Sequence, residues 1–171
     1  CLADAHTTAR HLLRVVADVD GQARVEPRRT RRLDLRAAVR AAAMMVQPPD
    51  GDIAIDAPEP AWVDGVDTRL VHVFAALFAE ALEHGAALVA RVRVTDLDVV
   101  VELRGDAATA PSPPPRRTHA AIDERSRALG RAVVQHVVAA HGGQLERRPI
   151  GGLAARVTLP AAPRIPFVSL E

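Results

Sequence analysis

Acidic side chains on one predicted helix are the first candidates for chemistry in this sequence. The stretch from Leu77 to His84 places Glu80, Glu83 and His84 among apolar residues. A carboxylate can ligate Mg²⁺, so Glu80 is a candidate metal ligand. The same spacing is typical of the solvated polar face of an amphipathic helix. We favour the solvated face over a working metal site.

Glycines that follow a strand or open a helix are the second group of candidates. Free backbone N–H groups at a helix N-terminus can hold phosphate, provided that no side chain blocks the approach. Gly130 lies at the start of a helix predicted over 129–140, and Gly105 with Asp106 follows a strand predicted over 98–104. A single glycine before a helix is weak evidence for a phosphate site.

Other arrangements of catalytic residues are missing from the sequence. The seven histidines show no metal-ligand spacing with cysteine or carboxylate, and there is no Gly-x-Ser-x-Gly motif. Cys1 is the single cysteine and lies at the terminus, where it is a poor candidate nucleophile. We therefore predict no catalytic residue and no metal site.

The composition narrows the class of protein. Hydrophobic residues make up 49% of the 171 residues, enough for a core, while aromatic residues make up 2% and asparagine and lysine are absent. The formal net charge of +1 gives no basic field for nucleic acid or an anionic membrane. No apolar run approaches the roughly 20 residues of a membrane span. A lone cysteine excludes an internal disulfide and fits a reducing cytoplasm.

An amphipathic helix is predicted over residues 2–26. Its apolar residues recur at alternating intervals of four and three, which is the spacing of a coiled-coil seam. One helix cannot bury such a seam alone, so the helix needs a partner helix. The seam residues are Ala5, Ala9, Leu12, Val16 and Val19.

The remaining elements follow from periodicity and turn residues. The Arg28–Arg32 cluster is predicted to be a polar connector, with Asp34 capping the helix after it. Residues 105–125, rich in Ala, Pro and Arg, are predicted to be a mobile loop. The predicted helices cover 35–46, 69–84 and 129–140, and the predicted strands cover 53–55, 61–63, 88–95, 98–104, 144–148 and 153–159.

The C-terminal third resembles the end of the ATP-binding domain of sensor histidine kinases. In that family a glycine-rich loop leads into a helix that ends in His-Gly-Gly, and a hairpin that ends in Leu-Pro follows. The matching residues here are Ser126 to Val134, His141-Gly142-Gly143, Gly151-Gly152 and Leu159-Pro160. The order of predicted elements extends the resemblance to nearly the whole chain.

The resemblance implies that the nucleotide site is degenerate. Glu80 stands where the family has its Mg²⁺-binding asparagine, and Gly105 stands where an aspartate accepts a hydrogen bond from adenine. Asp106 comes one residue late, so it points to the other face unless the strand is bulged. The three phosphate-loop glycines correspond to Ser126, Ala128 and Gly130. The residues of this vestigial pocket are Glu80, His84, Gly105, Asp106, Leu129 and Gly130.

We therefore expect an α/β two-layer sandwich with a mixed sheet and an N-terminal bundle helix. Residues 1–27 would be the second helix of a dimerisation hairpin, 33–160 the degenerate ATPase-like domain and 161–171 an extended tail. The expected function is a degenerate histidine-kinase-like module of a two-component pathway, which binds no ATP or other cofactor and acts by protein–protein interaction or as a phosphotransfer scaffold. Its expected partners are a second copy and a response-regulator receiver domain. The alternatives are a divergent active histidine kinase that binds ATP and Mg²⁺, and a compact regulator similar to anti-sigma factors.

Overall fold

The computed structural model describes residues 30–46, 53–82, 88–105, 120–147 and 153–163. The elements in chain order are β1 (Arg31–Asp34), α2 (Leu35–Val46), β2 (Ile53–Asp56), β3 (Trp62–Gly65), α3 (Asp67–Leu82), β4 (Leu88–Val94), β5 (Asp98–Gly105), α4 (Ala120–Ala140), β6 (Gln144–Arg147) and β7 (Leu153–Pro160).

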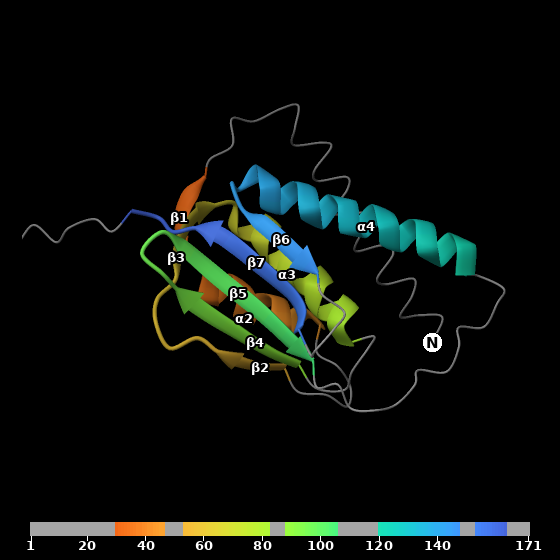
Figure 1. Ribbon diagram of the computed structural model, residues 1–171, viewed down its shortest axis with the longest axis horizontal. Helices are drawn as coiled ribbons and strands as arrows, with labels where there is room; N and C mark the ends of the chain where they lie inside the picture. The colour runs from red at the N-terminus through yellow and green to blue at the C-terminus, as the bar shows by residue number, and fades with distance from the viewer. Residues whose placement is uncertain (1–29, 47–52, 83–87, 106–119, 148–152, 164–171) are drawn as a thin grey trace, which may run out of the picture.

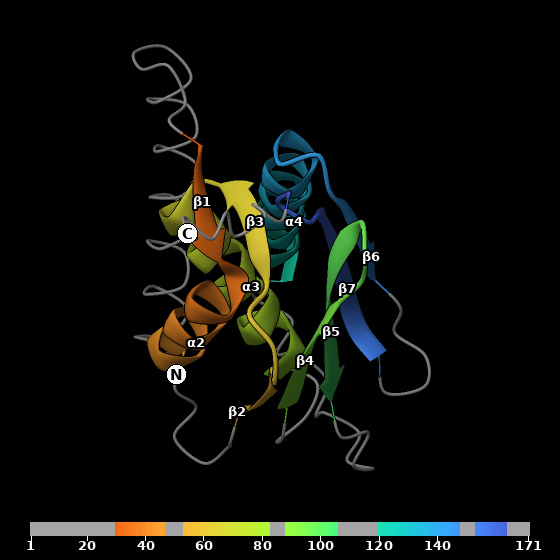
Figure 2. The same cartoon turned by 90° about the vertical axis from the view of Figure 1, so that its left-hand side faces the viewer.

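Five strands form a mixed sheet in the order β2-β4-β5-β7-β6. Strands β2 and β4 run parallel, and the other neighbours are antiparallel. Helices α2, α3 and α4 lie on one side of this sheet, as Figures 1 and 2 show from two directions. The predicted two-layer α/β sandwich with a mixed sheet is therefore confirmed.

Along the central strands, side chains alternate between the face that packs against the helices and the opposite face. Val99, Val101 and Leu103 on β5 are fully buried. The residues between them, such as Glu102 and Arg104, point to the opposite face because successive strand residues alternate. Phe74 on α3 is fully buried among the strand residues of the same apolar cluster. Each fully buried side chain of this size stabilises the fold by about 1.5–3 kcal/mol.

Helix α2 begins where its cap predicts. The Oδ1 atom of Asp34 accepts hydrogen bonds from the backbone N–H groups of Arg36 and Ala61, each at 3.1 Å. The first bond satisfies a helix N–H that has no partner within the helix, and the second ties the helix start to the segment before β3. The predicted bounds 35–46 match the observed helix.

Two predictions about local structure are wrong. Arg31 and Arg32, assigned to a connector, lie in β1, which pairs with β3 in a separate two-stranded sheet. There Arg32 lies 5.4 Å above the ring of Trp62. Helix α4 begins at Ala120 instead of 129, so the last part of the predicted loop 105–125 is helical. Pairing with β3 stabilises β1, and the local sequence of β1 does not reveal this partner.

Several predictions fall outside the described residues. These are the helix 2–26 with its whole seam, residues Glu83, His84 and Asp106, and the tail beyond residue 163. Among the helices that the structure describes, none is long and apolar enough to cross a membrane.

Candidate functional site

Glu80, the candidate metal ligand, is held by two arginines. Its Oε1 atom accepts a hydrogen bond from Nε of Arg131 at 2.8 Å, and its Oε2 atom accepts one from Nε of Arg147 at 3.3 Å. Arg131 comes from α4 and Arg147 from β6, so one carboxylate joins α3 to two elements that follow it by 51 and 67 residues. The Glu80 side chain is 28% exposed, which shields these charges partly from water.

The two ion pairs change what this site can bind. Each oxygen of Glu80 accepts a hydrogen bond from a guanidinium, so a metal ion at this carboxylate would share it with two cations that repel the metal. Two guanidiniums and one carboxylate leave an excess of one positive charge. The Nη2 atom of Arg147 is buried without a hydrogen-bond partner. Among the described residues, no group of three His, Cys, Asp or Glu is placed to hold a metal.

Gly105 is the last residue of β5 and lies on the same face of the strand as Leu103. The β4–β5 register runs without interruption from Val94↔Val99 to Leu88↔Gly105, so β5 contains no extra residue against β4. The register shift between Leu103 and Arg104 occurs against β7. A Cβ atom added at Gly105 would meet nothing within 4 Å. The place predicted for an adenine-binding aspartate is therefore roomy, and glycine offers no side chain there to bind a base.

The positions predicted to form a phosphate loop lie inside helix α4. Ser126, Ala128 and Gly130 are the seventh, ninth and eleventh residues of a helix that begins at Ala120. From the second turn of an α-helix onward, each N–H is bonded to the carbonyl four residues earlier. Their N–H groups are therefore not free to hold phosphate while the helix is intact.

Leu129, one of the predicted pocket residues, is 52% exposed. Figure 1 shows that α4 extends beyond the sheet at its N-terminal end. Further along the helix Val134, Val137 and Val138 are buried, as predicted. The next residue, Gly130, is buried, so Leu129 lies on a side of α4 that faces solvent.

The His-Gly-Gly motif at the end of α4 closes the helix and packs it closely against β7. Gly142 has a φ of +72°, the left-handed conformation that suits glycine after a helix. The N–H of Gly143 donates to the carbonyl of Val138 at 3.0 Å. A Cβ atom at Gly143 would lie 2.5 Å from the carbonyl oxygen of Thr158, so glycine permits this close approach. The motif is structural, as its sequence predicted.

Solved structures with the same arrangement of elements come from sensor histidine kinases. The ATP-binding domain of PrrB from Mycobacterium tuberculosis superposes with a TM-score of 0.58 at 22% identity. The match covers 79% of this chain and 99% of that domain's chain. The mycobacterial sensor histidine kinase MprB superposes with a TM-score of 0.56 at 21% identity, over 78% of this chain and 99% of that chain. The chain has the fold of a histidine-kinase ATP-binding domain.

The sequence itself shows no detectable similarity to a known family or to a curated protein. No family model matches the sequence, and no curated protein matches it. The histidine kinase AdeS of Acinetobacter baumannii superposes with a TM-score of 0.61 at 16% identity, over 89% of this chain and 76% of that chain. Such low identities establish the fold and leave function to the residues of the site.

Arg131 and Arg147 were not predicted to belong to this site. Glu80 was predicted to lie on a solvated helix face, whereas the structure brings two cations to it. No local sequence pattern links Glu80 to Arg131 and Arg147, which lie 51 and 67 positions further along the chain. The unusual Glu80 beside apolar neighbours was the one available signal that a cation would be needed nearby.

Proposed function

We propose that this chain is a degenerate histidine-kinase-like module of a two-component pathway, which does not bind ATP and acts through protein–protein interaction. The observation that carries the proposal is the engagement of Glu80 by Arg131 and Arg147. The residues of the site do not fit a magnesium–nucleotide complex, because the carboxylate is already neutralised. The helical state of residues 126–130 gives independent support.

Several lost contacts together would weaken ATP binding. A hydrogen bond to a charged group contributes about 1.5–3 kcal/mol, and three such contacts are missing or blocked at Glu80, Gly105 and the phosphate-loop positions. Losing them would weaken a micromolar site by more than about three orders of magnitude. Binding would also require unwinding of α4 around Ser126 or breaking of the Glu80 ion pairs.

The proposed partners follow from the same resemblance. We propose a homodimer in which the seam Ala5, Ala9, Leu12, Val16 and Val19 packs in a helical bundle, and a receiver domain as the second partner. Glutamates introduced together at Leu12 and Val16 would place two charges in the seam and cost several kcal/mol. Light scattering on the wild-type protein and on this double variant tests the proposed homodimer. A wild-type protein that is monomeric at all concentrations would remove the bundle and favour the compact regulator.

One observation favours the alternative of a divergent active kinase. The excess positive charge of Arg131 and Arg147, together with the buried Nη2 atom of Arg147, could accept an anionic phosphate group. In that case Glu80 would leave the arginines to ligate Mg²⁺, while Asp106 would reach adenine.

Titration calorimetry with ATP and MgCl2 separates the two functions. We expect no binding tighter than about 100 μM, which corresponds to roughly −5.5 kcal/mol. The single substitution Glu80→Asn should not create binding, because Gly105 and the helical α4 remain. Tighter ATP binding by the wild type that requires Mg²⁺ and disappears in Glu80→Gln would overturn the proposal and establish the divergent kinase.

A further inference from the structure

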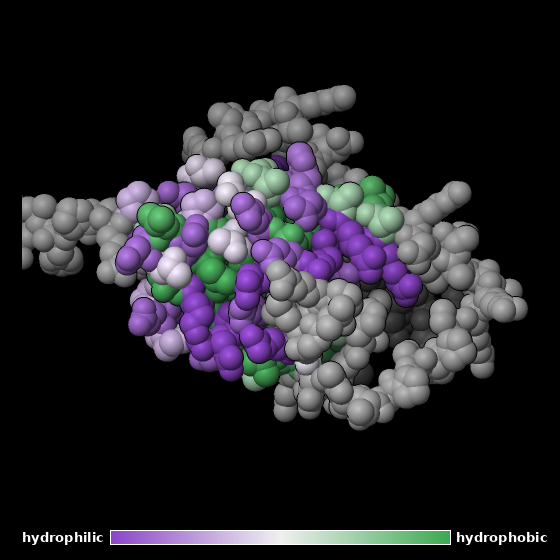
Figure 3. Space-filling model, in the orientation of Figure 1, coloured by the Kyte–Doolittle hydropathy of each residue, from purple (hydrophilic) through white to green (hydrophobic). Residues whose placement is uncertain are grey.

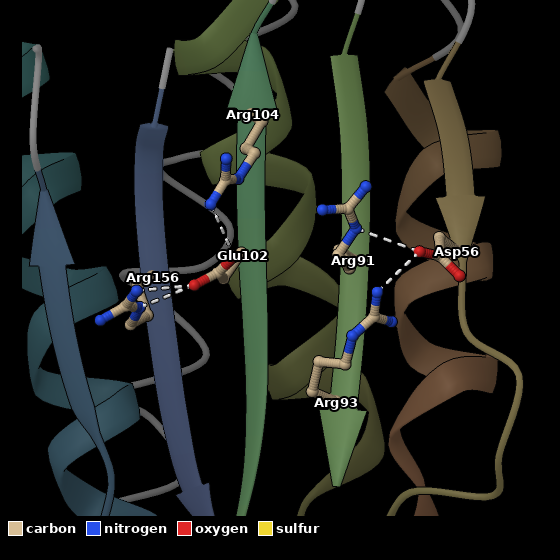
Figure 4. A network of polar contacts seen from close by, with 6 residues as sticks. All are labelled: Asp56, Arg91, Arg93, Glu102, Arg104 and Arg156. Atoms are coloured by element: carbon tan, nitrogen blue, oxygen red, sulfur yellow. Dashed lines mark hydrogen bonds and ion pairs between the residues drawn. The ribbon is translucent and has the colours of Figure 1, made fainter. Parts of the chain in front are cut away.

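The face of the five-stranded sheet opposite the helices carries balanced charges. Figure 4 shows four arginines on this face, and each carboxylate between them serves two of the four. The residues drawn are Asp56, Arg91, Arg93, Glu102, Arg104 and Arg156. Asp98 and Glu146 lie on the same face, so four carboxylates balance the four arginines. The face therefore has no excess charge with which to select a partner.

Exposed apolar side chains lie instead at the end of the molecule that holds β3 and the β4–β5 turn. Trp62 of β3 is 43% exposed, and Leu97 of the turn is 78% exposed. Arg32 lies over the Trp62 ring, 5.4 Å from its centroid, and still leaves the ring accessible. Figure 3 shows hydrophilic side chains over the open face of the sheet and apolar atoms at this end, on the left of the view. Trp62 and Leu97 together form the apolar end of the domain.

The chain leaves β7 between these two side chains. The N–H of Ala161 donates to the carbonyl of Leu97, and the N–H of Ala162 donates to the carbonyl of Trp62, each at 2.8 Å. Successive N–H groups of an extended chain point to opposite sides, so the β4–β5 turn lies on one side of this segment and β3 on the other. Neighbouring strands are about 4.8 Å apart, which places the backbones of Trp62 and Leu97 roughly 10 Å from each other.

The residues that follow Pro163 have the apolar side chains to cover this end. Half of the residues in 164–171 are large and apolar, namely Ile165, Phe167, Val168 and Leu170. The other two of the three phenylalanines in the chain, Phe74 and Phe78, are fully buried. Large apolar side chains are stabilised by removal from water. Segment 164–171 therefore favours an apolar surface, and the apolar end lies directly beside its start.

The segment is long enough to reach both side chains of the apolar end. Pro163 and Pro166 favour an extended chain, because a proline disfavours helical geometry in the residue before it. An extended residue spans about 3.3–3.6 Å, so Phe167 can lie up to about 14 Å from Pro163. That reach exceeds the distance between the backbones of β3 and the β4–β5 turn.

We propose that the apolar end is a docking surface for segment 164–171 of the same chain, with Phe167 packed against the Trp62 ring. Aromatic rings favour such contacts in offset or edge-to-face arrangements. A segment tethered this closely has an effective concentration in about the millimolar range, which favours it over a second copy at micromolar concentration. The proposal does not rest on the proposed function, because none of these residues belongs to the Glu80 site.

Trp62 is the single tryptophan, so its fluorescence reports the proposed contact directly. Acrylamide quenching of the full chain is compared with quenching of a chain shortened to residue 163. We expect the quenching constant to rise about twofold in the shortened chain, since one side of the ring loses its cover. Phe167→Ser in the full chain should produce most of the same rise, and it does not require the shortened chain to fold.

Three further measurements separate this contact from other effects. Glu171→Gln alters the same segment without changing its apolar residues, so it is the matched control and should leave quenching unchanged. Leu97→Ser, at a site exposed enough for the fold to tolerate it, should raise the quenching of Trp62 because the segment loses half of its docking surface. A peptide of residues 164–171 added to the shortened chain should restore the protection, and the same peptide carrying Phe167→Ser should not.

Equal quenching of the full and shortened chains would overturn the proposal, as would an unchanged quenching constant in Phe167→Ser. Protection of Trp62 that is lost when the full chain is diluted would also overturn it, because the occupant would then be a second copy. Protection that persists on dilution and is lost in Phe167→Ser, with Glu171→Gln unchanged, is the expected result.

Discussion

The Nε2 atom of His141 accepts a hydrogen bond from the backbone N–H of Val66, 75 residues earlier in the chain, at 3.1 Å. The other ring nitrogen, Nδ1, lies 2.7 Å from the carbonyl oxygen of Val137 and can only donate to it. The two bonds together fit the tautomer that carries its proton on Nδ1. This ring joins the end of α4 to the residue before α3, directly beneath Gly65.

Replacing His141 by alanine should destabilise the domain by about 1–3 kcal/mol, because the N–H of Val66 loses its acceptor and packing is lost against Gly65. Urea denaturation followed by the fluorescence of Trp62, the single tryptophan, measures the change. His136→Ala on the exposed side of the same helix is the control and should change stability little. Equal effects of the two substitutions would contradict the structural role of His141.

Two glycines should respond in opposite ways to alanine. Gly143→Ala places a methyl group 2.5 Å from the carbonyl oxygen of Thr158 and 2.6 Å from a methyl carbon of Leu159. Crowding of this kind costs about 1–3 kcal/mol. Gly105→Ala meets open space and should be neutral or slightly stabilising, since alanine restricts the unfolded chain. Thermal unfolding of both variants tests the pair, and an unaffected Gly143→Ala would show that the hairpin does not pack so closely.

The Glu80 ion pairs should hold α4 against α3. Glu80→Gln removes the charge that Arg131 and Arg147 share, and partly exposed ion pairs of this kind contribute up to about 1 kcal/mol each. We expect faster hydrogen exchange in the α4 amides, with α2 unchanged. Glu59→Gln, at an exposed site in the β2–β3 connection, is the control. Unchanged exchange in α4 would mean that the apolar contacts of Val134, Val137 and Val138 suffice.

Stability should fall in acid because three carboxylates have lowered pKa values. Burial alone would raise the pKa of Asp34, but hydrogen bonds from the Arg36 side chain and the N–H groups of Ala61 and Arg36 outweigh it. Hydrogen bonds from Arg93 lower the pKa of Asp56, and those from Arg156 lower the pKa of Glu102.

The direction of the pH effect follows from these shifts. A carboxylate whose pKa is lower in the folded state contributes its full stability above its ordinary pKa, 3.8 for aspartate and 4.5 for glutamate. That contribution is lost as the pH falls through the folded-state pKa. Urea denaturation at pH 7 and at steps below pH 5 measures the loss, and Asp34→Asn should make the curve shallower. Constant stability through this range would be inconsistent with the ion pairs.

The sequence predicted those parts of the fold that local residue patterns encode. The 35–46 helix, its Asp34 cap and the strands predicted over 88–95, 98–104 and 153–159 are encoded by neighbouring residues, so they match the observed elements to within one residue. Strand β1 was missed because it is held by pairing with β3 and not by its own composition. The start of α4 was misplaced because alanine and arginine suit both a loop and a helix.

The sequence by itself determined most helices and strands and the absence of asparagine, since residue type and periodicity are local properties. The resemblance of the element order to histidine-kinase domains then implied the sandwich. Only the tertiary structure decided where charges meet. It brought Arg131 and Arg147 to Glu80, and it placed Arg91 and Arg104 together on the open face of the sheet. Contacts between residues far apart in sequence depend on how helices and strands pack, and no local pattern specifies that.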